Sequence, residues 1–379
     1  MLQKADAMNI KEIRLSAKRR LPRVVFDYLE GGAEDEVTID DNVTSYNAWK
    51  FVPRRLTDIK NIETRVSVLG KEASFPGIIA PTGLNSLFWP NGDIALARAA
   101  EKTGIPFILS TASSDSIEKV AVQAGGELWF QLYVIERTLA KSLAGRALAA
   151  GYECLVITTD VVVNGKRERD IRNGFKMPFD YRLKTVIDGA LHPAWTLDYL
   201  RHGMPRLGNM ESDEAQTPEA KAALLSRSMD ASFSWDDLAW LRDIWPKKII
   251  IKGVLSPADV KMCIDYGMDG VVLSNHGGRQ LDTAAHPIDI LSALEREDRN
   301  IPLFIDGGVR RGRDIAKAKA LGAESVLLGR SVLYGLATGG EKGAVKSIDI
   351  LKDEFRCCMS QIGCSSSLEL NSNYVAKFK

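Results

Sequence analysis

The sequence lacks the features that mark secreted, membrane-spanning and nucleic-acid-binding proteins. It has only five cysteines in 379 residues, an odd number without paired CxxC spacing, which argues against a disulfide framework and a cysteine-based metal site. No run of 18 uninterrupted apolar residues could span a bilayer. The net charge is +1 with no tail of one sign, so no nucleic-acid partner is expected. The basic start of the chain has no continuous apolar core, so it does not predict a signal peptide.

What the chain does contain is a series of eight short apolar runs, each the size of a buried strand and bounded by turn residues. They cover residues 75–81, 106–110, 128–134, 154–160, 248–253, 270–275, 302–308 and 325–330. Amphipathic stretches such as 92–104 and 314–324 separate most of them. This alternation predicts one α/β domain over residues 1–379, a (β/α)8 TIM barrel whose first 74 residues form capping helices. A doubly wound sheet is the alternative, which the lack of an early GxGxxG motif disfavours.

One interval between these runs is too long for a simple strand-to-helix connection. Roughly 90 residues separate the fourth run from the fifth, whereas a connection that includes one helix needs far fewer. We therefore expect a long insertion after strand 4 of the barrel, at about residues 165–230.

Polar and small residues follow the predicted strands. The carboxyl ends of the strands form the active face of such a barrel, so these residues are expected to meet there. One polar ending could be a turn cap, but eight together favour a binding site. In chain order the residues are Pro81, Thr82, Gly83, Ser110, Gln131, Tyr133, Thr158, Asp160, Lys252, Ser274, His276, Arg279, Asp306, Gly308, Arg310, Gly329 and Arg330.

The last two strand ends predict a phosphate site. The segments DGGVRRG at 306–312 and LLGRS at 327–331 place glycines and arginines after strands seven and eight. Barrels often bind phosphate at this point, with backbone N–H groups and an arginine as donors. The phosphate would belong to a cofactor whose reactive ring lies over the mouth of the barrel.

A second group of strand-end residues predicts proton transfer on a carboxylate compound. Arg279 and Arg167 could clamp the carboxylate, one of them through two hydrogen bonds. His276 could take a proton, and a buried Asp160 could orient the imidazole and stabilise its cation. The chain has only four histidines, and this one lies in a glycine-rich strand ending beside an arginine, which disfavours a purely structural role.

These residues resemble the FMN-dependent α-hydroxy-acid oxidase and dehydrogenase family. The family signature Ser-Asn-His-Gly-x-Arg-Gln reads SNHGGRQ at 274–280, and other similar segments extend the resemblance over essentially the whole chain. Those segments lie at 21–36, 130–134, 158–170, 252–254 and 306–314. The resemblance implies a (β/α)8 barrel that binds FMN, oxidises a small 2-hydroxy acid and forms a homotetramer.

The resemblance also implies a role for each matching residue. His276 would be the base toward the substrate α-carbon or hydroxyl, paired with Asp160. Two arginines would hold the substrate carboxylate, two tyrosines would hydrogen-bond the carboxylate or hydroxyl, and a lysine near flavin N1 would stabilise the anionic reduced flavin. The implied catalytic residues are His276, Asp160, Arg279, Arg167, Tyr28, Tyr133 and Lys252. The implied FMN-binding residues are Ala80, Pro81, Thr82, Ser110, Gln131, Thr158, Lys252, Ser274, Asp306, Gly308, Arg310, Gly329 and Arg330.

Within the family the sequence most resembles the branch that oxidises (S)-mandelate. The insertion contains DGALHPAWTLDYLRHGMPRLGN at 188–209, which is similar to the membrane-binding segment of that branch. We expect residues 177–215 to form a membrane-binding or active-site insertion, with 185–210 meeting the membrane. Trp195, Leu197, Tyr199 and Leu200 lie there among basic residues, a mixture that suits a bilayer interface. A mobile loop over the active site, or a contact with a neighbouring subunit, is the alternative.

Two small residues also point to that branch. Glycolate oxidases carry a tryptophan where Ala112 stands, and a small residue leaves room for a phenyl ring. Many relatives have alanine where Gly83 stands, whereas glycine is typical of the mandelate-oxidising branch.

The sequence therefore predicts oxidation of (S)-mandelate, or a similar (S)-2-hydroxy acid, to the 2-keto acid. Electrons would pass to a membrane quinone, and the enzyme would lie peripherally on the cytoplasmic face of the inner membrane. An L-lactate or glycolate oxidase of the same fold is the first alternative, and hydrogen peroxide released per turnover separates the two. A catalytically silent membrane-bound barrel is the second.

Overall fold

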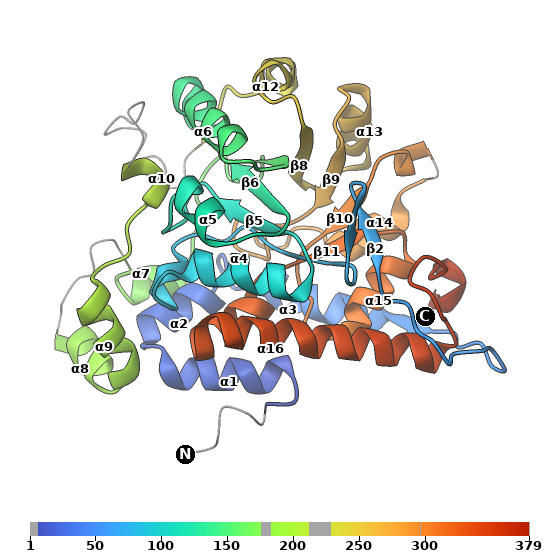
Figure 1. Ribbon diagram of the computed structural model, residues 1–379, viewed down its shortest axis with the longest axis horizontal. Helices are drawn as coiled ribbons and strands as arrows, with labels where there is room; N and C mark the ends of the chain where they lie inside the picture. The colour runs from blue at the N-terminus through green and yellow to red at the C-terminus, as the bar shows by residue number, and fades with distance from the viewer. Residues whose placement is uncertain (1–6, 176–182, 212–228, 296, 379) are drawn as a thin grey trace.

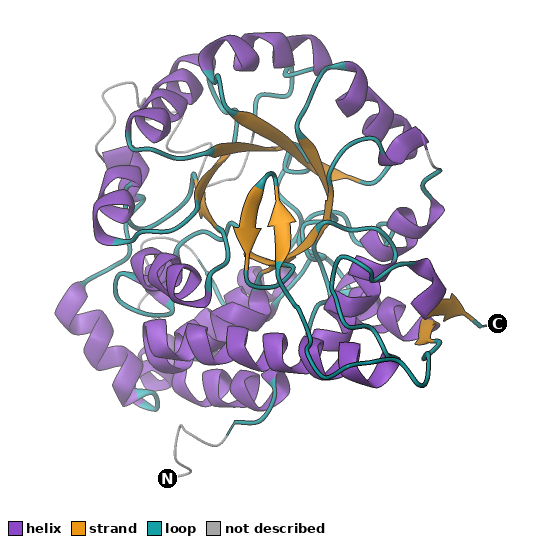
Figure 2. Ribbon diagram, turned by 45° about the vertical axis from the view of Figure 1, so that its right-hand side comes forward, coloured by secondary structure: helices purple, strands orange, loops and turns teal. Residues whose placement is uncertain are grey.

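Eight parallel strands close into a barrel, as the apolar runs predict. The computed structural model describes residues 7–175, 183–211, 229–295 and 297–378. Figure 2 shows the ring of strands surrounded by helices. Nearly every strand residue is buried, because helices cover the outside of the sheet and side chains fill its interior. The strands are β4 (Gly77–Ile79), β5 (Phe107–Ser110), β6 (Leu128–Leu132), β7 (Cys154–Thr158), β8 (Lys248–Val254), β9 (Gly270–Leu273), β10 (Leu303–Ile305) and β11 (Ser325–Leu328).

Helices follow the strands and form the outer layer of the barrel. The last and longest begins directly after β11 and carries non-helical backbone at Gly339 and Gly340, where two helical segments join. It runs beside the first helix of the chain along one edge of the molecule (Figure 1). The outer helices are α4 (Gly92–Thr103), α5 (Ile117–Gln123), α6 (Arg137–Ala149), α12 (Leu238–Ile244), α13 (Pro257–Asp265), α14 (Pro287–Ala293), α15 (Gly312–Ala320) and α16 (Arg330–Ile362).

The segment before the barrel holds the predicted helices and also strands that were not predicted. Three α-helices come first, followed by one strand that pairs with the last strand of the chain and by a two-stranded hairpin. They are α1 (Ile10–Arg20), α2 (Arg23–Glu30), α3 (Val37–Ser45), β1 (Trp49–Phe51), β2 (Val66–Val68), β3 (Lys71–Ala73) and β12 (Val375–Lys377). Short 3-10 helices lie at η1 (Tyr46–Ala48), η2 (Asn85–Leu87), η3 (Trp235–Asp237), η4 (Glu297–Arg299) and η5 (Ser372–Tyr374).

The hairpin β2–β3 closes the amino end of the barrel. Val66, Val68 and Ala73 are buried in one cluster with interior side chains of the strands, including Trp129 and Phe304. Figure 2 shows the hairpin lying across the ring of strands. The barrel is therefore a filled core with one open end, the carboxyl end of the strands.

The long connection between β7 and β8 carries several short helices. They are α7 (Glu168–Arg172), α8 (Leu183–Ala190), α9 (Pro193–His202) and α10 (Gly208–Glu211). Of the predicted insertion, residues 177–182 and 212–215 lie outside the described residues. Figure 1 shows α8 and α9 as a pair at the edge of the molecule, beside α1 and α2. Among the described residues, no helix combines the length and the apolarity that crossing a bilayer needs.

The α8–α9 pair exposes a different set of side chains from the one expected. Trp195 is only 8% exposed, and its indole N–H donates to the carbonyl of Leu87 at 2.7 Å. Tyr199 stacks on Trp195 with ring centroids 5.1 Å apart, so the aromatic residues dock α9 on the barrel instead of facing outward. The expectation that Trp195 lies at an interface is wrong, because it occupies the buried side of the helix. The exposed apolar residues here are Leu183, Val186, Ile187, Leu191, Leu197 and Leu200.

The hairpin should stabilise the fold without shaping the cavity, because it lies at the opposite end of the barrel. We expect Val68→Ala to lower the free energy of unfolding by about 2 kcal/mol, because it leaves a cavity in a filled interior. Urea denaturation measures the change, with Ser67→Ala on the exposed face of β2 as the matched control. Equal stability of the two variants would contradict a closing role for the hairpin.

Candidate active site

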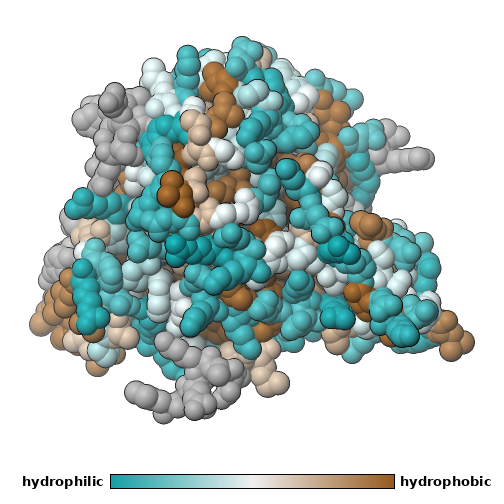
Figure 3. Space-filling model, in the orientation of Figure 1, coloured by the Kyte–Doolittle hydropathy of each residue, from teal (hydrophilic) through white to brown (hydrophobic). Residues whose placement is uncertain are grey.

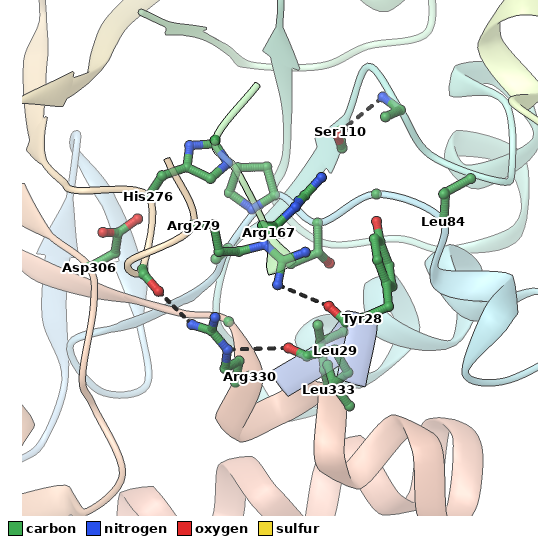
Figure 4. Close-up of a pocket in the computed structure, with 18 of the residues that line it drawn as sticks. Tyr28, Leu29, Leu84, Ser110, Arg167, His276, Arg279, Asp306, Arg330 and Leu333 are labelled. Carbon is green, nitrogen blue, oxygen red and sulfur yellow. Dashed lines mark hydrogen bonds between the residues drawn. The ribbon is translucent and has the colours of Figure 1, made fainter. Parts of the chain in front are cut away.

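A cavity of about 850 Å³ lies at the open, carboxyl end of the barrel. Residues from the strand-end loops line it, together with Tyr28 and Leu29 of α2. In Figure 4 the side chains of His276, Arg167, Arg279 and Tyr28 converge on this space. Residues that are far apart in the sequence are thus brought together as the strand-end pattern predicts.

His276 and Asp160 form a hydrogen-bonded pair at this cavity. The Nδ1 atom of His276 lies 2.8 Å from an oxygen of Asp160, which fixes the ring and leaves Nε2 as the other ring nitrogen. Burial alone would raise the pKa of Asp160, but the neighbouring His276 and Lys252 outweigh burial and lower that pKa. The carboxylate therefore stays ionised and can stabilise a positive charge on the imidazole.

Lys252 places a buried positive charge next to this pair. Its ammonium group donates to the Ser274 hydroxyl at 2.8 Å and lies 3.0 Å from a carboxylate oxygen of Asp306. Burial alone would lower the pKa of Lys252, but the negative charges of Asp306 and Asp160 outweigh burial and raise that pKa above its usual value. The lysine remains a cation at neutral pH, and its charge acts strongly because water is excluded.

Two arginines supply donors for a carboxylate. Arg167 is 7% exposed; its Nη2 donates to Asn164 at 3.2 Å, whereas Nε and Nη1 make no hydrogen bond with the described residues. Arg279 donates through Nη1 to the backbone carbonyls of Tyr28 and Gly31, at 2.9 and 2.8 Å, which holds its guanidinium against α2. The buried N–H groups of Arg167 need acceptors. An anionic ligand beside the two guanidinium groups would supply them.

Asp170 also lines this cavity, although we did not predict a role for it. Its Oδ2 lies 3.2 Å from Nε of Arg167, three residues earlier along the chain. Burial raises the pKa of Asp170 to about 6; Arg279 opposes the rise, and Asp27 and Glu36 add to it. The spacing of three residues on one short helix was the only sequence signal that could have suggested the contact.

One wall of the cavity is apolar and built from small and aromatic residues. Gly83 and Ala112 are in contact there, since a Cβ added to Gly83 would lie 3.0 Å from that of Ala112. Phe175 stacks on Tyr28 with ring centroids 4.3 Å apart. Leu207, from the insertion, completes the wall and was not predicted, because nothing in its neighbourhood distinguishes it from a surface leucine. This wall suits an apolar, planar group.

A row of polar groups beneath the cavity fits the edge of a heteroaromatic ring. Ser110 donates to Oε1 of Gln131 at 3.0 Å, while Nε2 of Gln131 and Oγ1 of Thr158 have no partner among the described residues. Asp306 likewise has one unpartnered oxygen. Ser110, Gln131 and Thr158 end the adjacent strands β5, β6 and β7, and Asp306 follows β10 on the opposite side of the barrel, so their donors and acceptors lie at the same end of the barrel. Buried polar atoms are rarely left unpaired, which favours a ring that carries both donors and acceptors.

The phosphate site predicted after the last two strands has suitable groups. Gly308 has a φ of 78° and turns the chain where a side chain would collide with Asn42, and Arg310 lines the cavity beside it. Gly329 precedes the first turn of α16, whose N–H groups suit an anion. The Arg330 side chain donates through three of its five N–H groups to the carbonyls of Leu29, Gly277 and Gly31, so the other two and its backbone N–H suit the phosphate.

The remaining predicted residues lie where the sequence placed them. Ala80, Pro81, Thr82 and Tyr133 also line the cavity. The residues therefore fit a cofactor with a polar heteroaromatic ring at one end and a phosphate at the other.

Comparison with known proteins gives consistent matches. The family model described as FMN-dependent dehydrogenase matches residues 17–377. The chain is 52% identical over 370 residues to (S)-mandelate dehydrogenase of Pseudomonas putida, covering 98% of this chain and 94% of the relative. It is 39% identical over 376 residues to a putative L-lactate dehydrogenase of Mycobacterium tuberculosis, covering 98% and 90%. A crystal structure described as the monotopic membrane protein (S)-mandelate dehydrogenase superposes with a TM-score of 0.95 at 51% identity, covering 98% of this chain and 100% of that one.

The position of Asp170 predicts a pH dependence of anion binding. As pH rises through about 6 the carboxyl loses its proton and places a negative charge beside Arg167. We expect the affinity for a small monocarboxylate to fall over this range, by roughly fivefold beyond any change in Asp170→Asn. Titrations of the two proteins between about pH 5 and pH 7.5 measure the difference. Identical pH profiles would show that Asp170 does not act on the bound anion.

Proposed function

We propose a specific activity from one premise: the chain belongs to the FMN-dependent dehydrogenase family. The resemblance drawn from the segment 274–280 is thereby confirmed, and the chain is an FMN-dependent enzyme that oxidises 2-hydroxy acids. We assign (S)-mandelate, or a closely similar aryl 2-hydroxy acid, as its substrate and the 2-keto acid benzoylformate as the product. The small size of Gly83 and Ala112 carries this choice, because neither residue projects a large side chain into the cavity, which favours an aryl group on this wall.

The proposed reaction follows from the arrangement of charges. FMN, when bound, would accept the two electrons that the substrate loses when its 2-hydroxyl carbon is oxidised to a ketone. His276 accepts a proton from the α-carbon or hydroxyl, and the adjacent Asp160 holds the ring and stabilises the imidazolium. Lys252 contributes a fixed positive charge that favours negative charge developing beside it.

The arginines set the orientation of the substrate. Arg167 has unpartnered N–H groups and would take the carboxylate, while Arg279 is fixed against α2 and adds a second positive charge. Tyr28 and Tyr133 also line the cavity and would donate to the carboxylate or hydroxyl. Holding the carboxylate on one side and the aryl group on the apolar wall presents one face of the α-carbon to His276. This arrangement supports a preference for one enantiomer.

Removal of the base should separate chemistry from cofactor binding. We expect His276→Ala to retain a yellow flavin but to slow anaerobic flavin reduction by (S)-mandelate by roughly 10²–10⁴-fold. Stopped-flow absorbance measures the rate. His286→Ala is the matched control, because His286 contacts Asp41 and Asp289 and does not line the cavity. Near-normal reduction by the His276 variant would refute its role as the base.

The exposed residues of α8 and α9 support attachment to a membrane surface. Leu183, Leu191 and Leu200 are 76%, 72% and 73% exposed. Figure 3 shows hydrophobic side chains gathering at this edge of the molecule. An ion pair between Arg20 and Asp198, and a hydrogen bond of 2.6 Å from the Arg23 N–H to Asp188, fix the two helices to the body of the protein. A rigid apolar edge of this kind suits insertion into one leaflet.

A membrane quinone is the proposed electron acceptor. The connection between β7 and β8 carries both the exposed edge and one side of the cavity rim, where Ile171 lines the cavity and is exposed. A protein seated through α8 and α9 would therefore hold its cavity close to the bilayer. An apolar acceptor dissolved in that bilayer would reach the flavin without crossing much water.

The exposed edge can be tested without altering the cavity. We expect the combined change Leu183→Ser, Leu191→Ser and Leu200→Ser to weaken binding to phosphatidylglycerol and phosphatidylethanolamine vesicles by about 100-fold, because each leucine loses apolar burial. Vesicle flotation measures binding. The matched control replaces three exposed apolar residues elsewhere, Leu56, Val122 and Leu368, with serine. Equal loss in both proteins would rule out α8 and α9 as the membrane-binding edge.

A further inference from the structure

Two buried asparagines form a reciprocal pair just behind the active site. Nδ2 of Asn42 donates to Oδ1 of Asn275 at 2.9 Å, and Nδ2 of Asn275 donates to Oδ1 of Asn42 at 2.8 Å. Asn275 also donates to the carbonyl of Ala285 at 3.2 Å. The side chains are 2% and 4% exposed, so the pair exchanges its hydrogen bonds away from water. Two cooperating bonds between planar amides fix both position and orientation.

Asn275 directly precedes the catalytic histidine, whose backbone is unusual. His276 has a φ of 56°, in the left-handed region that residues other than glycine seldom adopt. Its N–H donates to the Ser274 hydroxyl at 3.0 Å, and the same hydroxyl accepts from Lys252. A strained residue keeps such a conformation only when its surroundings hold it there. The amide pair fixes the residue that directly precedes His276.

Asn42 also contacts the loop proposed to hold the cofactor phosphate. A Cβ added to Gly308 would lie 1.9 Å from the carbonyl oxygen of Asn42, and one added to Gly307 would lie 3.2 Å from its Nδ2. Both glycines have positive φ, at 86° for Gly307 and 78° for Gly308. One side chain of α3 thus touches the histidine loop and the glycine loop together.

The helix that carries Asn42 is itself fixed to the histidine loop. Asp282 accepts the backbone N–H of Thr38 at 2.8 Å and that of Val37 at 3.3 Å, which caps the start of α3. The N–H of Ala33 donates to the carbonyl of Gly278 at 2.9 Å. These bonds fix the start of α3 to the residues that follow His276, so the helix and the histidine loop hold one relative position.

We infer that Asn42 and Asn275 are positioning residues that hold the His276 loop and the phosphate-binding glycine loop in one fixed relation. The inference rests on the proposed function, since it concerns the same base and the same cofactor site. Neither asparagine reaches the cavity, and both act through the loops that they join. A small shift of the loop would misplace His276 relative to the substrate, and misplacements of about 1 Å cost rate steeply.

Asn42→Asp tests this inference through a pH-dependent loss of rate, which a change in packing alone would not produce. When protonated, the introduced carboxyl can both donate to and accept from Asn275, as the amide does. When ionised, it loses the donor and opposes Oδ1 of Asn275. We expect flavin reduction at saturating substrate to be slower by roughly 30-fold at about pH 8, with a change in KM below about threefold. At about pH 5.5 the deficit relative to the native protein should shrink to below about fivefold.

A second readout does not depend on catalysis. Because the Asn42 side chain faces Gly307 of the glycine loop, we expect the dissociation constant for FMN, measured by flavin fluorescence, to rise in Asn42→Asp by roughly tenfold at about pH 8 and to recover at about pH 5.5. Asn47→Asp is the matched control, because Asn47 is exposed and lies five residues away. If Asn42→Asp does not fold at the higher pH, Asn42→Ala replaces it and should be impaired equally at both pH values.

The outcomes separate this inference from the proposed function. Native-like rates and FMN affinity for Asn42→Asp at both pH values would overturn the positioning role while leaving the activity intact. A pH-independent deficit in Asn42→Asp equal to that of Asn42→Ala would also overturn it, because the reciprocal bonds would then be irrelevant. If the native protein is not reduced by any 2-hydroxy acid, the proposed function fails, and FMN affinity alone still tests the pair.

Discussion

The partly buried hydrogen bond between His276 and Asp160 is the interaction on which the rest of the site depends. It joins two different strand-end loops, after β7 and β9, which flank β8, so it forms only when these three strands are paired. Removing His276 would leave the buried Asp160 carboxylate without this partner, which is more costly than losing an exposed ion pair. The surrounding charges follow from this constraint, because Lys252 favours the ionised carboxylate and Asp306 in turn favours the lysine cation.

The cavity has a charged and polar side and an apolar side, which come from different parts of the chain. Charged and polar groups come from the strand ends, where parallel strands deliver their side chains to one rim. The apolar wall combines Gly83 and Ala112, which follow β4 and β5, with Tyr28 of α2 and with Phe175 and Leu207 of the connection between β7 and β8. That connection also carries the exposed leucines of α8 and α9, so one insertion shapes the recess for the substrate and the edge proposed to meet the membrane.

The barrel strands and most site residues could be predicted from sequence because their signals are local. Each strand is a short apolar run, and the polar residues stand directly after it. The hairpin β2–β3 was not predicted, because three-residue strands carry almost no pattern and depend on the barrel interior for burial. Trp195 was assigned to the wrong surface, because composition cannot tell which side of a helix faces the protein. Asp170 and the Asn42–Asn275 pair become visible only in the fold, which brings distant residues into contact.

The most direct test of the account is an anaerobic comparison of substrates. Purified yellow protein is mixed with (S)-mandelate, (R)-mandelate, L-lactate and glycolate, and flavin bleaching is followed by stopped flow. The recess at Gly83 and Ala112, with the carboxylate held at Arg167, predicts fast bleaching by (S)-mandelate alone. Faster bleaching by L-lactate or glycolate would contradict the assignment of an aryl substrate, although the fold and the His276–Asp160 chemistry would stand.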